Sequence, residues 1–167
     1  MGNEAEITAK FWKALRKDMT MFLGLAEGED GHARPMTAQL DNDDTDGGPI
    51  WFFTSTDNKL FAQLGEGVIG GGQRAMAHFV SKGHDVWATL HGSLSGTRDR
   101  ATIERLWNPF VAAWYEGKDD PKIALIRLEP ENAEIWIDAN SAVAGIKMLL
   151  GIDPKKDYKD KVAEVTL

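Results

Sequence analysis

The first regular pattern along the chain is an apolar residue at every fourth position: Ile7, Phe11, Leu15 and Met19. This spacing predicts an opening helix with one apolar face. Asn3 and Glu6 have the spacing of a capping box, so we expect the helix to begin there. The basic residues of this segment lie mostly off the apolar face, which leaves that face free to pack on a sheet.

After this helix the apolar period changes from four residues to two, which is typical of strands. The alternation predicts about six antiparallel strands joined as successive hairpins, from the runs 19–26, 33–40, 49–55, 73–81, 86–95, 123–128 and 133–138. Short helices are expected over residues 58–64, 98–107, 109–115 and 142–150. The pattern indicates a β-rich α+β domain built on an antiparallel barrel with flanking helices.

Turn formers and charges mark the connections between these elements. Residues 41–48 read as an exposed acidic turn. Residues 65–72 hold five glycines but lack the Lys-Ser/Thr pair of a phosphate-binding P-loop, so we interpret them as a connection. Because no repeat or linker divides the chain, we expect one domain over residues 1–152 and a charged, solvated tail over residues 153–167.

The net charge of −7 limits what this barrel can be expected to bind. It leaves no excess of lysine and arginine for phosphate contacts along DNA or RNA, so we expect no nucleic-acid partner. The chain has no cysteine, which excludes disulfides and thiolate chemistry. No run approaches the roughly 20 apolar residues of a membrane span. These features predict a soluble, cytoplasmic protein whose anionic ligands would need cations placed locally.

Residues 32–59 hold the clearest candidate for a ligand site. The first strand of this hairpin carries Arg34 and Thr37 among short apolar residues, and the second is aromatic and ends in the hydroxyls of Thr54 and Ser55. Cations and hydroxyls bind phosphate, and flat apolar side chains bind aromatic rings. The hairpin therefore has the chemistry to hold a large anionic cofactor beside an aromatic wall.

Each of these side chains also has an ordinary structural explanation. Arg34 is equally compatible with a surface position on an edge strand. Strand alternation sends neighbouring side chains to opposite faces, so at least two of Trp51, Phe52 and Phe53 are expected in the core.

Two further patterns imitate metal sites. Residues 42–47 resemble the start of an EF-hand loop, but the twelfth position is Phe53 instead of glutamate and no helix flanks the loop. His78, His84 and His91 fall in two strands and a turn without a fixed register, and each is expected to be a surface or cavity histidine. We therefore predict no metal site.

Several motifs resemble, in this order, the general stress protein branch of the pyridoxamine 5'-phosphate oxidase-like flavoproteins. They are Arg34-Pro35-Met36, Trp51-Phe52-Phe53-Thr54-Ser55, Lys59, Leu106-Trp107-Asn108-Pro109, Trp114 with Gly117, Asp120-Pro121 and Ala133-Glu134-Ile135-Trp136. The resemblance spans about residues 5–140. It implies a split β-barrel that forms a homodimer and binds FMN at the dimer interface.

The resemblance also implies roles for individual residues. The strand with Arg34, Pro35, Met36 and Thr37 would run along the flavin ring, and Phe53, Thr54 and Ser55 would line the ribityl chain. Lys59, together with Arg34, would neutralise the phosphate, and either Trp114 or Trp136 would wall the ring from the second subunit. No catalytic residue is indicated.

Two features differ from the family pattern. The glycines at positions 70–72 lengthen the connection after the Lys59 helix, and no basic cluster for a substrate phosphate is recognisable near the C-terminus. Oxidation of vitamin B6 is therefore not expected. The leading hypothesis is an FMN-dependent oxidoreductase acting on an unidentified small molecule. The alternatives are a flavin-binding stress or redox-response protein without turnover, and the same groove holding deazaflavin or haem.

Overall fold

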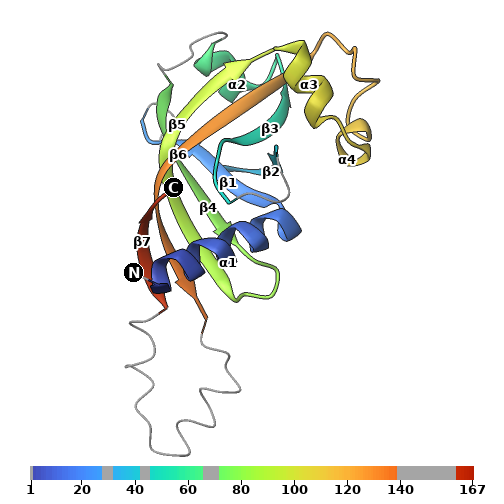
Figure 1. Cartoon of the computed structure of the whole chain (residues 1–167). Helices are drawn as coiled ribbons and strands as arrows, with labels where there is room; N and C mark the ends of the chain where they lie inside the picture. The colour runs from blue at the N-terminus through green and yellow to red at the C-terminus, as the bar shows by residue number, and fades with distance from the viewer. Residues whose placement is uncertain (1, 28–31, 42–45, 66–71, 139–160) are drawn as a thin grey trace, which may run out of the picture.

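The computed structural model describes residues 2–27, 32–41, 46–65, 72–138 and 161–167. In chain order its elements are α1 (Gly2–Asp18), β1 (Thr20–Leu25), β2 (Arg34–Leu40), β3 (Ile50–Ser55), α2 (Lys59–Leu64), β4 (Gln73–Val80), β5 (Val86–Thr97), α3 (Arg100–Leu106), α4 (Pro109–Ala112), β6 (Ile123–Ile137) and β7 (Val162–Thr166) (Figure 1).

The strands form one antiparallel sheet that closes on itself. Within the described residues the strand order is β3-β2-β1-β4-β5-β6-β7, and an additional pairing of β3 with β6 closes six of the strands into a barrel. β6 pairs with β5 along one edge, and its other edge pairs first with β3 and then with β7. This confirms the predicted antiparallel barrel and adds β7 as a strand outside it.

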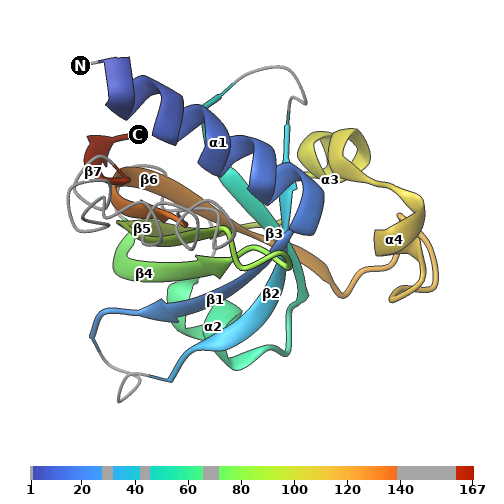
Figure 2. The same cartoon turned by 90° about the horizontal axis from the view of Figure 1, so that it is seen from below.

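Strand alternation fills the barrel with apolar side chains. Along β5 buried and half-buried residues alternate without interruption from Val86 to Thr97, as expected of a sheet with one face in the core. Helix α1 packs against β5, β6 and β7 and lies across the sheet with its first turn close to β7 (Figure 2). The rings of Phe11 and Phe79, whose centroids are 5.9 Å apart, join helix and sheet edge to face.

The predicted apolar face of α1 is largely confirmed. Ile7, Phe11 and Leu15 are buried, but Trp12 is buried beside them although the four-residue repeat omits it. The expected capping box is wrong because the helix already includes Asn3. Met19 lies beyond the helix with a positive φ of 58°, a conformation that ends the helix and starts β1.

The predicted break between residues 128 and 133 is also wrong. β6 continues from Ile123 to Ile137 as one strand, and its register against β5 shifts between His91 and Gly92. Gly92 faces Pro130 and His91 faces Asn132, so Glu131 is an extra residue on β6. The proline and acidic residues that suggested a loop form a β-bulge instead.

The solvated tail expected over residues 153–167 is wrong for its last part. β7 pairs with β6 from Asn132↔Thr166 to Trp136↔Val162, and it buries Ala163 and Val165. These residues form a strand despite the neighbouring lysines, because alternate apolar side chains on one face of the strand pack in the core. The helix predicted over residues 142–150 lies outside the described residues.

A second apolar cluster lies outside the barrel, between its wall and α3. It consists of Trp51, Ile103, Leu106, Ile123 and Leu125. Because α3 contributes Ile103 and Leu106 to this cluster, the cluster fixes the part of the barrel surface on which α3 and the following α4 lie. No described helix is long and apolar enough to cross a membrane.

Gly92→Ala is expected to lower the free energy of unfolding by about 1 to 3 kcal/mol or more, through overpacking. A Cβ at this position would lie 2.1 Å from the backbone oxygen of Glu129, so the bulge has no room for it. Urea denaturation measures the change. Gly117→Ala is the matched control, because a Cβ there meets nothing within 4 Å; equal losses in both variants would contradict the bulge.

Candidate functional site

Strands β2 and β3 pair next to the turn that connects them and separate farther from it. Within the described residues their register covers only Leu40↔Ile50, Gln39↔Trp51 and Ala38↔Phe52. Its continuation would place residues 35–37 opposite residues 53–55, but these segments pair only with their outer neighbours, β1 and β6. Pro35 has no amide hydrogen and cannot donate a ladder bond in any case. One backbone edge of each strand is therefore left facing the space between them.

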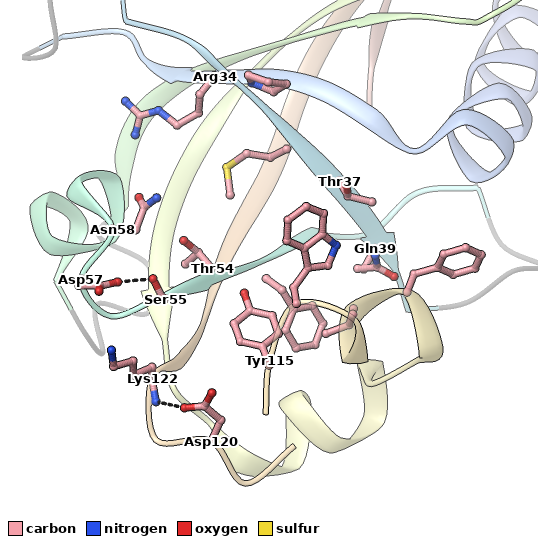
Figure 3. Close-up of a pocket in the computed structure, with 16 residues that line it drawn as sticks. Arg34, Thr37, Gln39, Thr54, Ser55, Asp57, Asn58, Tyr115, Asp120 and Lys122 are labelled. Carbon is pink, nitrogen blue, oxygen red and sulfur yellow. Dashed lines mark hydrogen bonds between the residues drawn. The ribbon is translucent and has the colours of Figure 1, made fainter. Parts of the chain in front are cut away.

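A pocket of about 650 Å³ occupies this space (Figure 3). The lining residues come from the two separated strands, the start of α2, the α4 segment and the loop before β6. They are Arg34, Pro35, Met36, Thr37, Gln39, Phe53, Thr54, Ser55, Asp57, Asn58, Phe110, Val111, Trp114, Tyr115, Asp120 and Lys122.

Charged and hydroxyl groups gather at one end of the pocket. Figure 3 shows Ser55, Asp57, Asn58 and Lys122 close together, with Arg34 on the facing strand. The Ser55 hydroxyl donates to Asp57, and this bond, with a smaller effect of the Lys122 charge, lowers the pKa of that carboxyl below its ordinary value. Asp57 is therefore ionised at neutral pH.

Aromatic rings form the opposite wall. Phe53 and Tyr115 line the pocket, and they contact each other and Trp107, which is not a lining residue, with ring centroids 6.2 to 6.4 Å apart. Burial, followed by the charge of Asp120, raises the pKa of the Tyr115 phenol. The phenol therefore remains a hydrogen-bond donor throughout the neutral range.

One asparagine ties the α4 segment to β2. The Asn108 side-chain oxygen accepts from the amides of Phe110 and Val111 and so caps α4. Its amide nitrogen donates to Gln39 Oε1 at 2.9 Å. The same side chain therefore begins α4 and fixes it across the pocket from β2.

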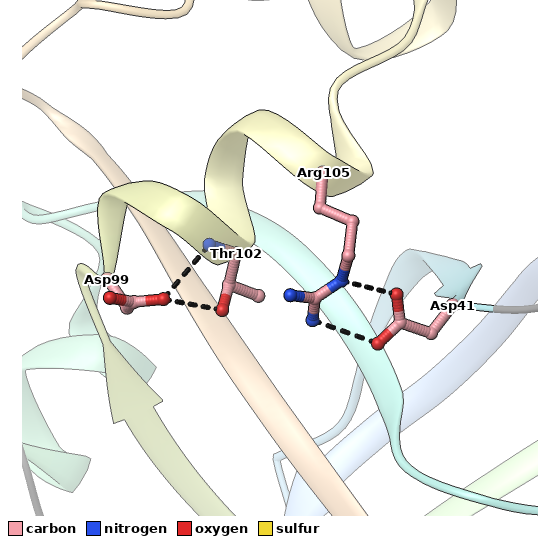
Figure 4. A network of polar contacts seen from close by, with 4 residues as sticks. All are labelled: Asp41, Asp99, Thr102 and Arg105. Carbon is pink, nitrogen blue, oxygen red and sulfur yellow. Dashed lines mark hydrogen bonds and ion pairs between the residues drawn. The ribbon is translucent and has the colours of Figure 1, made fainter.

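Arginines hold α3 and the following loop in place. Arg105 forms a bidentate ion pair with Asp41 at the end of β2, at 2.6 and 2.9 Å, and hydrogen bonding to Asp41 raises its pKa (Figure 4). Arg98 donates to the carbonyl of Pro121, and Arg100 bonds to Asp119 at 3.0 Å. These contacts connect the α3 end of the pocket wall to both β2 and the loop that carries Asp120 and Lys122.

The first turn of α3 is fixed by its own cap. Asp99 accepts from the Thr102 hydroxyl at 2.6 Å and from its backbone amide at 2.9 Å. These two bonds lower the pKa of Asp99. Figure 4 shows this cap and the Arg105–Asp41 pair at successive positions along α3.

The chain matches the model of the pyridoxamine 5'-phosphate oxidase-like family over residues 6–158. The chain belongs to this family. Similar solved structures support the assignment, whereas no curated protein matches the chain.

Three of these structures are general stress proteins. One from Xanthomonas campestris pv. campestris, of the general stress family, is 55% identical over 84% of this chain and 92% of that chain, with a TM-score of 0.75. The general stress FMN/FAD binding protein from Xanthomonas citri is 55% identical over 81% and 92%, with a TM-score of 0.73. A general stress protein 26 from Jannaschia sp. CCS1 is 28% identical over 98% and 99%, with a TM-score of 0.77.

The pocket of this pyridoxamine 5'-phosphate oxidase-like chain brings together most of the predicted site residues. Arg34, Pro35, Met36, Thr37, Phe53, Thr54, Ser55 and Trp114 all line it. Lys59 is an exposed residue at the start of α2, next to the lining residue Asn58, but does not line the pocket itself. Trp136 lies on β6, where it pairs with Trp87 and lines a different pocket of about 510 Å³.

Sequence reasoning missed several lining residues of this family member. Gln39 lies two residues after Thr37 on the same predicted strand, so strand alternation places both on one face. Lys122 directly precedes a predicted strand. The sequence pattern could therefore have indicated both residues. Tyr115 and Asp120 lie in a segment whose path depends on the contacts of Arg98 and Arg100. No pattern in the sequence reveals those long-range contacts.

The candidate metal patterns take separate positions in the structure. His78 and His91 lie on β4 and β5, and His84 lies in the turn between them. The described residues include no group of three or more histidine, aspartate or glutamate side chains placed to hold a metal. Residues 42–45 of the acidic turn lie outside the described residues.

Tyr115 is expected to titrate above pH 10, where an unperturbed phenol is half ionised. Tyrosine absorbance near 295 nm, followed between about pH 9 and 12, measures this titration. Tyr115→Phe should remove the late component and leave the titration of the chain's other tyrosine, Tyr158. A late component that survives in Tyr115→Phe would show that Tyr115 is not shielded in the pocket wall.

Proposed function

We propose that this chain binds FMN in the space between β2 and β3 and uses it as a flavin-dependent oxidoreductase on a small molecule. The observation that carries the proposal is the separation of two paired strands into a pocket with charged and hydroxyl groups at one end and aromatic rings at the other. The Xanthomonas citri relative, an FMN/FAD binding protein at 55% identity, supports the same cofactor class.

The pocket fits a flavin in size and in the chemistry of its lining. Small-molecule sites usually measure about 300 to 1,000 Å³, and this one is about 650 Å³. The edge of an isoalloxazine ring carries hydrogen-bond donors and acceptors, and the inner backbone edges of residues 35–37 and 53–54, which do not pair with each other, offer both. The ring faces need apolar contact, which Met36 and Phe53 supply.

The phosphate of FMN would lie at the charged end of the pocket. Arg34 and Lys122 would pair with it, with Lys59 reaching the same corner from the start of α2. The Ser55 hydroxyl, which donates to Asp57 in this structure, would turn to the phosphate. The ribityl chain would then pass along Thr54.

The chain's own residues would orient and shield the cofactor. When bound, the flavin supplies hydride or electron transfer. The strand edges would fix the plane of the ring, and the segment with Trp114 and Tyr115 would cover one side of the pocket. The protonated Tyr115 hydroxyl would be a hydrogen-bond donor at neutral pH.

We further propose that the chain acts as a homodimer with the cofactor at the interface. Exposed apolar surface on the barrel itself supports this, since Phe22 is 51% and Val80 is 49% exposed. Trp87 and Trp136 form a second half-buried pair on the outer face of the barrel, and the partner's copy of that face would bring Trp136 to the ring. The cytoplasmic location expected from the sequence remains a prediction.

One observation favours a second candidate, flavin binding without turnover. Among the described lining residues there is no histidine to exchange a proton near neutral pH. A chain of this kind would store or sense FMN. Steady turnover of NAD(P)H or oxygen by the FMN-loaded protein would count against this candidate and for the oxidoreductase.

The direct experiment is an absorbance spectrum of the purified protein followed by titration with FMN. We expect the purified protein to show a flavin spectrum or to bind added FMN saturably, with one FMN per chain. Competition with FAD, deazaflavin and haem establishes which cofactor is preferred. Neither a flavin spectrum nor binding of added FMN would end the proposal.

Lys122→Ala is expected to weaken FMN binding by about 1.5 to 3 kcal/mol, or roughly 10- to 150-fold, because a charge-assisted bond to phosphate is lost. Fluorescence quenching of FMN measures the affinity. Lys118→Ala, which removes an exposed lysine outside the lining, is the control. Riboflavin lacks the phosphate, so a matching loss of riboflavin affinity would remove Lys122 from the phosphate site.

Asp57→Asn is expected to tighten FMN binding by roughly tenfold, because one like-charge repulsion is removed. The ionised Asp57 competes with a phosphate for Ser55 and Lys122. Riboflavin affinity should stay the same in this variant. Weaker FMN binding by Asp57→Asn would show that the phosphate lies elsewhere.

A further inference from the structure

The two ends of the pocket differ in charge. Its lining cations, Arg34 and Lys122, lie at the end with Ser55, whereas Gln39 lies at the opposite end (Figure 3). Five residues of extended chain separate Arg34 from Gln39 along β2, which corresponds to roughly 17 Å. The Gln39 end therefore has a different ligand chemistry from the phosphate end.

Gln39 is a buried polar side chain with a hydrogen-bonding group left over. Its exposure is only 8%, and its Oε1 accepts from Asn108 at 2.9 Å. Among the residues that the structure describes, its amide nitrogen has no hydrogen-bond partner. Because Asn108 occupies the Gln39 oxygen and Gln39 lines the pocket, this nitrogen is placed to donate to a ligand.

Apolar and aromatic side chains surround this donor. Phe110, Val111 and Trp114 line the same pocket from the α4 segment, which Asn108 fixes to Gln39. Phe110 and Trp114 are largely exposed, so their rings are open to contact by a ligand. Flat aromatic surfaces bind flat ligands by stacking and area burial.

We propose that Gln39, Phe110 and Trp114 form a substrate subsite for an uncharged, flat aromatic compound that carries a carbonyl group. The subsite rests on the proposed function, because FMN would fill the charged end and leave this end for the substrate. The Gln39 amide donates to the carbonyl, and the rings of Phe110 and Trp114 hold the flat face.

The same arrangement disfavours phosphorylated or sulfonated substrates. The lining residues on the α4 side are neutral, and the carboxylate of Asp120 in the following loop lies beside Lys122 at the other end of the pocket (Figure 3). Moving an anion from water to such a surface without a cation is unfavourable. Tyr115, held in its protonated form, adds a neutral donor and no positive charge.

Equilibrium dialysis with matched probes tests the subsite on the full chain saturated with FMN. The probes are 1,4-naphthoquinone, its anionic twin 1,4-naphthoquinone-2-sulfonate, and pyridoxamine 5'-phosphate. Because the chain has no cysteine, the quinones cannot form thiol adducts. We expect the neutral quinone to bind at one site per chain and both anionic probes to bind at least about tenfold more weakly.

Two variants assign the binding to the proposed residues. Gln39→Glu keeps an acceptor for Asn108 but replaces the donor by a carboxylate, and Trp114→Ala removes an exposed ring that the core does not need. Each should weaken the neutral quinone by about tenfold or more. Phe22→Ala is the control, since Phe22 is an exposed aromatic residue on β1 outside the lining.

The outcomes separate this inference from the proposed function. Equal or tighter binding of the anionic probes, or unchanged quinone affinity in both variants, overturns the subsite. Conversion of a dimer to a monomer by Trp114→Ala, seen by sedimentation, also overturns it, because a second copy would then cover the ring. If the chain fails to bind FMN, the proposed function fails, and dialysis of the FMN-free chain still decides whether the neutral quinone selects Gln39 and Trp114.

Discussion

The separation of β2 from β3 after Ala38 and Phe52 is the constraint on which the rest of the site depends. Strand backbones need hydrogen-bond partners along both edges, and here each strand keeps its outer partner while its inner edge is left open. Closure of the barrel makes this possible, because the β3–β6 pairing holds β3 in place without help from β2. A ligand with hydrogen-bonding edges fits the opening better than water alone.

Side chains around the opening keep it from closing. The apolar cluster of Trp51 with Ile103 and Leu106 places α3 against the barrel wall, and the Arg105–Asp41 pair fixes α3 to the end of β2. The bond from Asn108 to Gln39 then sets α4 across the pocket. Surface ion pairs are individually weak, so the apolar cluster supplies most of the stability and the polar contacts supply the geometry.

The sequence predicts much of this architecture because local patterns specify it. Alternating residues in β5 and the apolar face of α1 lead to the right elements, and the hairpin with Arg34, Phe53 and Ser55 supplies residues that line one pocket. The continuity of β6 could not be read in this way, because a bulge at Glu131 looks like a turn until Gly92 is known to face it. Tyr115 and Asp120 reach the pocket through contacts distant in sequence, so no periodicity reveals them.

The charge distribution makes the two ends of the pocket chemically different. Cations and hydroxyls at the end near Ser55 suit a phosphate, and the neutral, aromatic end near Gln39 suits an uncharged ring. Both ends share one cavity, and a cofactor and a substrate that meet within it would lie next to each other. This is the spatial requirement of flavin chemistry, in which the protein mainly binds and orients.

Backbone-amide NMR shifts on addition of FMN test the central claim most directly. The account predicts that the largest changes fall on both open strand edges, at Arg34, Met36 and Thr37 on β2 and at residues 53–55 on β3. The outer pair Trp87 and Trp136 would change less, and only through the partner subunit. Changes confined to that outer face, with the amides of residues 34–37 and 53–55 unmoved, would contradict the account.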